Sequence, residues 1–169
     1  DGAGTFAAGK GSNFGDPNNP TGPSTTLGAT WNFGFYVDVQ GAVSLGDFLD
    51  ASGSSIHLLY DFKPGAGTDE SQLGDIDLGA VVGAETMSLV TTVQDSENLL
   101  FGFLAVPGTG ITPPGGSFNP NASGEYSFSL RLVDAAGATL GQSAINVDVP
   151  EPATLALIGL GLAGLGIIR

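Results

Sequence analysis

The stretch GEYSFSLRLVDAAGATLGQSAINVDV, residues 124–149, alternates apolar and polar side chains on both sides of a short polar segment. Tyr126 and Phe128 fall on one face of its first half, and Val147 falls on one face of its second half. Such alternation is typical of β-strands with one buried face, and residues 134–137 have the composition of a tight turn. The sequence therefore predicts a β-hairpin.

The same two-residue period recurs upstream of this hairpin. It is long in TWNFGFYVDVQ (30–40) and SIHLLYDF (55–62), and shorter in DIDLGAVV (75–82) and TMSLVTTV (86–93). The run LLFGFLAV (99–106) is apolar on both faces, which predicts a strand that is either covered on both sides or rests its second face against a partner. Gly-rich turns separate these runs, so we expect an all-β fold, an antiparallel β-sandwich of about seven or eight strands.

Composition narrows the class of protein. The 169-residue chain has 17 acidic and 4 basic residues, a formal charge of −13, and no cysteine. A surface of this charge repels phosphate backbones, which excludes nucleic acid as a partner. The absence of cysteine excludes disulfides and thiolate chemistry. We expect the numbering to start at a mature end, after removal of a leader peptide.

Three segments follow from these patterns. Residues 1–29 are a Gly/Pro/Asn-rich N-terminal arm with few apolar anchors, and we expect it to be irregular. Residues 30–149 are the predicted extracytoplasmic β-sandwich, and residues 150–169 are an apolar tail. Glycine-rich linkers and polar turns fill the spaces between strands, including a long loop at 107–124.

The tail has the character of a single transmembrane helix. Ala153–Ile168 carries no charged side chain and would span roughly 24 Å at about 1.5 Å per residue. This is somewhat short of the ~30 Å hydrocarbon core of a bilayer. Basic residues next to a transmembrane helix favour the cytoplasmic side, so the basic C-terminal end of this helix would lie in the cytoplasm and the β domain would lie outside the cytoplasm. The predicted anchor residues are Ala153, Leu155, Leu157, Ile158, Leu160, Leu162, Leu165, Ile167, Ile168 and Arg169.

Small residues form a stripe on the predicted tail helix. Gly159, Ala163 and Gly166 fall on one side of it. Small side chains allow close approach of another transmembrane helix. We therefore expect these three residues to be the helix-packing positions.

The junction between domain and tail carries a recognisable motif. Val149, Pro150, Glu151 and Pro152 precede the Leu/Ile/Gly-rich run and its basic end. This arrangement resembles the PEP-CTERM sorting signal of bacterial exported proteins. The resemblance implies export, recognition by an exosortase and delivery to an envelope that is often rich in exopolysaccharide. It departs from the family in one respect, because the family usually ends in several basic residues and this chain has Arg169 alone.

These features predict a non-enzymatic, membrane-anchored structural or assembly protein of the bacterial cell envelope. Its domain would lie in the periplasm or on the extracellular side of the inner membrane, with exosortase, integral-membrane proteins and extracellular polysaccharide as partners. The alternative is an accessory subunit of a large photosynthetic or respiratory membrane complex, with the tail helix packed against other subunits. A third hypothesis is carbohydrate binding, which requires Trp31 or Tyr36 at the surface. The alternation of apolar and polar residues in the segment 30–40, however, places Trp31 in the core.

Few residues suggest chemistry. Asp69, Glu70, Asp75 and Asp77 cluster in an oxygen-rich stretch that can bind Ca²⁺, although their spacing does not match an EF-hand and no other cofactor is indicated. The same acids could pair as glycosidase carboxylates. The only histidine, His57, falls on the opposite face of its strand from the apolar residues. The sequence has no GxSxG motif, which would indicate the nucleophilic serine of a catalytic triad. We expect a surface or hydrogen-bonded histidine and no catalytic residue.

Overall fold

The computed structural model describes residues 4–14, 27–41 and 43–151. Within these residues the chain forms ten strands, three short α-helices and two 3-10 helices, so the expectation of a mostly β protein is confirmed. No helix in these described ranges is long and apolar enough to cross a membrane. The predicted transmembrane helix and its packing positions lie outside the described residues.

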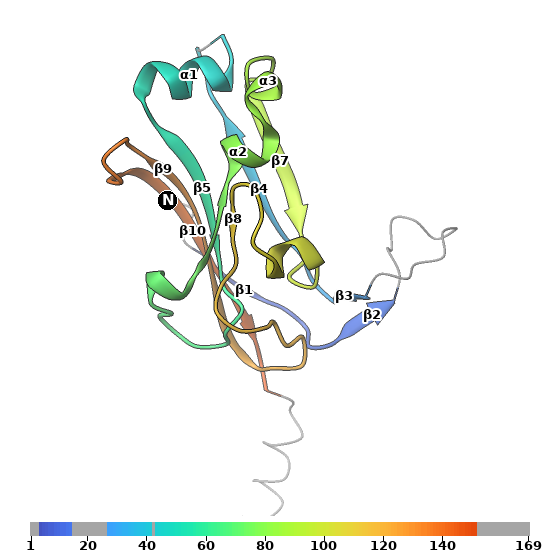
Figure 1. The fold of residues 1–169 in the computed structure, drawn as a ribbon. Helices are drawn as coiled ribbons and strands as arrows, with labels where there is room; N and C mark the ends of the chain where they lie inside the picture. The colour runs from blue at the N-terminus through green and yellow to red at the C-terminus, as the bar shows by residue number, and fades with distance from the viewer. Residues whose placement is uncertain (1–3, 15–26, 42, 152–169) are drawn as a thin grey trace, which may run out of the picture.

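The largest sheet has six strands (Figure 1). The predicted hairpin supplies its second and third strands and is closed by hydrogen bonds from Asp134 N to Ala138 O (2.9 Å) and from Gly137 N to Asp134 O (3.0 Å). All neighbouring strand pairs in this sheet are antiparallel except one, in which Gly4–Ala7 runs parallel to Thr139–Val149. The expectation of a purely antiparallel fold is therefore wrong at this edge of the sheet. In spatial order the strands are β1 (Gly4–Ala7), β10 (Thr139–Val149), β9 (Gly124–Val133), β5 (Ser55–Tyr60), β6 (Gly74–Asp77) and β8 (Ile111–Thr112).

A second layer lies against one face of this sheet. It consists of β4 (Phe33–Asp38) paired antiparallel with β7 (Thr92–Glu97). Phe33 of β4 stacks on Phe128 of β9 with ring centroids 4.3 Å apart. The apolar faces of the two layers therefore meet in one core, as the alternating sequence patterns require.

The core is built from the apolar face of the six-stranded sheet, here called the inner face, and from the second layer and connecting segments that pack against this face. Tyr60, Tyr126 and Leu104 are fully buried, and the phenolic hydroxyl of Tyr60 donates to the carbonyl oxygen of Leu104 (2.6 Å). The buried inner-face side chains are Ile56, Leu58, Tyr60, Ile76, Tyr126, Phe128, Val147 and Val149.

The N-terminal arm contains strands that its composition did not predict. In addition to β1, residues of the arm form β2 (Ser12–Phe14) and β3 (Leu27–Ala29), which pair with each other. Backbone hydrogen bonds hold the arm in place, because Thr30 N donates to Gly11 O and Gly11 N donates to Pro120 O. Polar composition lowers strand propensity, but main-chain pairing with an existing sheet edge does not depend on apolar side chains.

Helix α1 (Leu45–Ser52) is also absent from the sequence predictions. It begins at Ser44, whose hydroxyl oxygen accepts a hydrogen bond from Asp47 N at 3.0 Å and donates to the Asp47 carboxylate at 2.8 Å. It ends at Gly53, whose φ of 62° is the left-handed conformation that glycine adopts without strain. These two caps explain why a short amphipathic segment becomes helical here.

Two of the predicted strands are only half correct. The run 75–82 enters β6 but continues as α2 (Leu78–Val82), because the Asp77 carboxylate accepts a hydrogen bond from Ala80 N and caps a helix. The run 86–93 begins in α3 (Ala84–Met87) and becomes extended only at β7. Helices α1, α2 and α3 lie together at the end of the domain opposite the C-terminal end of β10 (Figure 1).

The predicted strand at 99–106 is wrong. This segment turns and forms the 3-10 helix η2 (Gly102–Ala105). Leu99 and Leu104 are buried, whereas Phe103 and Val106 are 45% and 60% exposed. The segment is apolar on both faces because it crosses the surface of the core, not because it is a strand covered on both sides.

Candidate functional site

The end of β10 leads directly into the predicted sorting motif. Val149 is the last residue of the strand, is 1% exposed and is the register partner of Gly124. Pro150 and Glu151 follow and are both exposed. The last strand of the described residues therefore ends at Val149, and Pro150 and Glu151 beyond it are accessible. Pro152 and the predicted anchor residues lie outside the described residues.

Two of the candidate calcium ligands have local partners. The Asp69 carboxylate accepts hydrogen bonds from the backbone and hydroxyl of Ser71, at 2.9 and 2.6 Å, and begins the 3-10 helix η1 (Glu70–Gln72). These bonds lower the pKa of Asp69. Glu70 forms a bidentate ion pair with Arg131 of β9, which lowers the pKa of Glu70. Both acids are exposed.

The other two candidate ligands lie on β6 and have different partners. Asp75 contacts His57, and Asp77 caps α2. In the described part of the chain, no group of three or more His, Cys, Asp and Glu residues is arranged to hold a metal ion. The four acids are close in sequence, but the structure does not bring them together as a ligand set.

The outer face of the six-stranded sheet, opposite the inner face, carries a hydrogen-bonded group of three side chains. Ser55 Oγ lies 2.8 Å from Nε2 of His57. Nδ1 of His57 lies 2.9 and 3.0 Å from the two carboxylate oxygens of Asp75. His57 is 22% exposed and Asp75 is 39% exposed. The expectation of a hydrogen-bonded histidine on the polar face of its strand is confirmed.

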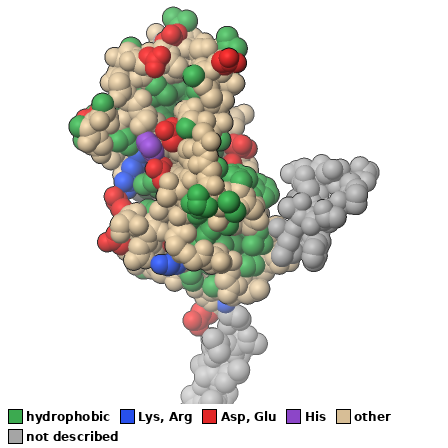
Figure 2. Space-filling view, in the orientation of Figure 1, with side chains coloured by type: hydrophobic (Ala, Val, Ile, Leu, Met, Phe, Trp, Pro, Cys, Tyr) green, Lys and Arg blue, Asp and Glu red, His purple; other side chains and the backbone are tan. Residues whose placement is uncertain are grey.

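Register explains why these three residues meet. Ser55 and His57 are two positions apart on β5 and so lie on the same face. Asp77 of β6 is the direct partner of His57, and Asp75 is the diagonal neighbour. On the other side of β5, Arg131 of β9 is the partner of His57. Figure 2 shows the histidine at the surface with acidic and basic side chains around it.

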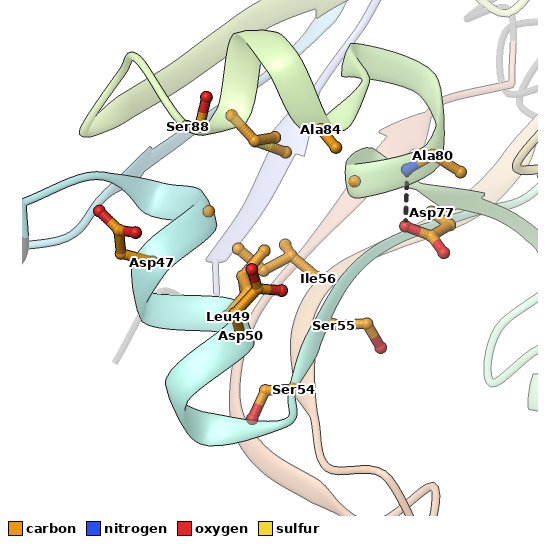
Figure 3. A pocket seen from close by; sticks show the side chains of 13 residues that line it. Asp47, Leu49, Asp50, Ser54, Ser55, Ile56, Asp77, Ala80, Ala84 and Ser88 are labelled. Atoms are coloured by element: carbon orange, nitrogen blue, oxygen red, sulfur yellow. Dashed lines mark hydrogen bonds between the residues drawn. The ribbon is translucent and has the colours of Figure 1, made fainter.

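A pocket of about 290 Å³ opens between α1, the α2–α3 segment and the start of β5. Its apolar wall includes Leu49, Ile56 and Met87. Asp47 and Asp50 stand on α1, with Asp77 across the pocket from them (Figure 3). Their carboxylates give the pocket mouth a negative character, which disfavours an anionic ligand.

A second buried polar group ties the end of β7 to β3. Asn98, which follows β7 and is 4% exposed, accepts a hydrogen bond from Ala29 N at 2.8 Å and donates to the carbonyl oxygen of Ala29 at 3.0 Å. Its neighbour Glu97 is 8% exposed. Burial, and to a smaller extent the charge of Asp95, raises the pKa of Glu97 to about 7.

The aromatic residues considered for carbohydrate binding lie in different environments. Trp31 is half-buried and packs against Tyr126, Phe118 and Phe128 with ring centroids 5.8 to 6.1 Å away. Tyr36 of β4 is 60% exposed. The prediction that Trp31 belongs to the core is confirmed, and Tyr36 remains the accessible aromatic residue of the pair.

The structure defines a mostly β domain whose last strand runs without a spacer domain into a C-terminal signal segment. Comparison with known families identifies the signal, because the model of the PEP-CTERM protein-sorting motif matches residues 148–169. The resemblance found in the sequence is thereby confirmed, and the chain carries the signal of an exported, exosortase-sorted protein. No curated protein and no solved structure gives a significant match.

Proposed function

We propose that this chain is a structural protein of the bacterial cell envelope that works outside the cytoplasmic membrane through binding and assembly. The observation that carries the proposal is the position of the sorting motif. Its match starts at Asp148, within the last two residues of β10, and continues through exposed Pro150 and Glu151. An enzyme that recognises the motif can reach these exposed residues while the domain remains folded.

The domain supports a binding role through its surface. Tyr36, Leu89 and Val106 are 60%, 84% and 60% exposed, so apolar contact area is present outside the core. The high negative charge keeps the domain soluble and favours neutral or cationic partners, such as uncharged polysaccharide. In this proposal the tail anchors the protein in the membrane until exosortase acts on it.

The accessory-subunit alternative now has less support. It drew on a doubly apolar strand at 99–106, which is the η2 segment instead. We therefore retain envelope delivery as the proposed function.

The test is to express the full chain in bacterial hosts with and without a matching exosortase and to measure its intact mass and cell fraction. We expect removal of the tail only in the host with exosortase, and retention of the processed domain in the envelope or polysaccharide fraction. Glu151→Gln should block processing because it alters the exposed acid of the motif. The matched control is Glu85→Gln, an exposed acid on α3 that lies outside the motif.

Two outcomes would contradict the proposal. Equal processing in the two hosts would exclude exosortase as the sorting enzyme. Complete release of the processed domain into the medium would contradict a structural role in the envelope.

A further inference from the structure

The group formed by Ser55, His57 and Asp75 has the atom order required for nucleophilic chemistry. The serine oxygen lies 2.8 Å from Nε2 of His57, and the carboxylate lies 2.9 Å from Nδ1 of the same ring. Each ring nitrogen therefore has one partner. This is the relation of nucleophile, base and orienting acid that recurs on unrelated protein folds.

Hydrogen-bond chemistry assigns the protons in this group. An ionised Asp75 only accepts hydrogen bonds, so Nδ1 of His57 is the nitrogen that carries the proton. In neutral imidazole Nε2 is then an acceptor, and the hydroxyl of Ser55 donates to it. This tautomer is the one in which histidine removes a proton from serine.

The fold holds the group firmly and leaves it accessible. Ser55 and His57 are fixed on the same strand, and β5 is paired on both sides, with β6 and with β9. The 22% exposure of His57 and 39% exposure of Asp75 leave a route from solvent. Ser55 also lines the pocket beside α1, but its hydroxyl is directed away from Leu49 and Ile56 of the pocket wall (Figure 3), so the reactive side is the outer face of the sheet.

We propose that Ser55 is an activated nucleophile that accepts an acyl group from an ester. Ser55 Oγ forms a bond to the acyl carbon while its proton moves to Nε2 of His57. The bond between the acyl carbon and the alcohol oxygen of the ester then breaks, and His57 returns the proton to that oxygen. The products are the O-acyl protein and the free alcohol, so atoms and charges balance without a further reactant.

Charge on the outer face selects the class of ester. Asp77 of β6 lies directly opposite His57, Arg131 on the other side of His57 is neutralised by its ion pair with Glu70, and the chain as a whole has a formal charge of −13. A neutral or cationic ester meets no repulsion there, whereas an ester that carries a carboxylate does. The step modifies the protein itself, so it goes beyond the proposed structural function and does not depend on sorting by exosortase.

The probe for this site is p-nitrophenyl acetate, a neutral ester. We expect the full chain to release p-nitrophenolate and to gain an acetyl group that peptide mapping places on Ser55. Ser55→Ala should abolish the adduct. His57→Gln should slow its formation by about 10²-fold, the usual contribution of a general base. Asp75 is a positioning residue, and Asp75→Asn should slow the reaction through His57.

The controls separate reactivity from structure. Ser54→Ala alters the neighbouring hydroxyl, which is buried without a hydrogen-bond partner within the described ranges, and should leave acylation unchanged. The pH–rate profiles of the unaltered chain and of His57→Gln should differ, because only the unaltered chain has an imidazole in contact with Ser55. Circular dichroism should show that each variant is folded.

The result that would overturn the proposal is equally clear. Absence of an acetyl adduct on Ser55 of the folded chain would show that the three side chains only cross-link strands. An adduct on Ser55 that forms at the same rate in folded His57→Gln would show that the serine is not activated by His57.

Discussion

The inner and outer faces of the six-stranded sheet are made by the same strands but have opposite characters. On β5, Ile56, Leu58 and Tyr60 are buried against the second layer, while Ser55 and His57 face outward and form polar contacts. Packing density constrains the inner face, so each side chain there contributes to stability. The outer face needs only a fixed backbone, which leaves its side chains available for binding or chemistry.

The strongest test of this contrast compares neighbouring residues of β9. Tyr126 is fully buried against Trp31 and Phe118, whereas Ser127 faces outward. We expect Tyr126→Ala to lower the free energy of unfolding by about 4 kcal/mol, through lost burial and a cavity. Ser127→Ala should change it by about 0.5 kcal/mol or less. Urea unfolding followed by circular dichroism measures both, and equal effects would contradict the assignment of the faces.

A tight approach on the inner face gives the next largest effect. A Cβ atom added to Gly74 would lie 2.5 Å from Pro114 and from the ring of Tyr60. Gly74→Ala should therefore destabilise the protein by about 3 kcal/mol through overpacking. Gly102→Ala is the matched control, because a Cβ there meets nothing within 4 Å. Thermal unfolding of the two variants should separate them clearly, and similar melting temperatures would mean that Gly74 is not closely packed.

Glu97 is a buried acid that should make the stability of the protein depend on pH. It is the register partner of Phe33, faces the core and has a pKa raised to about 7 by burial. Because the folded protein holds this proton more tightly than the unfolded chain, the stability contributed by Glu97 is fully present below the ordinary pKa of 4.5 and is lost as pH rises toward 7.

Glu97→Gln should remove this loss. We expect the variant to be more stable than the unaltered chain at pH 8 by on the order of 2 kcal/mol, with little difference at pH 4. Urea unfolding at the two pH values measures the change. A constant difference between the two proteins across this range would contradict a buried, titrating Glu97.

The ion pair on the outer side should have the smallest effect. Glu70 is 69% exposed where it contacts Arg131, which is 13% exposed. Water and salt screen such a pair, so Glu70→Gln should cost less than about 1 kcal/mol, and added salt should reduce the difference further. Unfolding at low and high ionic strength tests this. A loss as large as that of Gly74→Ala would place the pair in a far less polar environment.

The parts of the fold that could be predicted from sequence are those in which side-chain alternation is regular. Such alternation located β4, β5, β9 and β10 because one face of each strand is buried. The short helices were missed because they depend on caps and not on long periodicity. The spacing of Ser44 and Asp47 was the available signal for α1, since a serine followed three residues later by an acid is typical of a helix start.

The candidate sites also differ in how far a local sequence pattern could predict them. The sorting motif is a local sequence pattern and was recognisable from the residues alone. The outward-facing position of His57 also followed from the strand period. Its contact with Asp75 depends on the register of β5 against β6, which is set by the intervening turn and η1 segment and is not encoded in any local motif.

The position of β10 has a mechanical consequence. The strand joined to the tail is paired with β9 along nearly its whole length and with β1 over Ile145–Asp148. Tension applied through the tail acts along the strand, so it loads many interstrand hydrogen bonds in shear at the same time and does not peel them one by one. Resistance to such a pull is set by the rate of unfolding, which makes this strand a suitable attachment point for a domain held at a surface under flow.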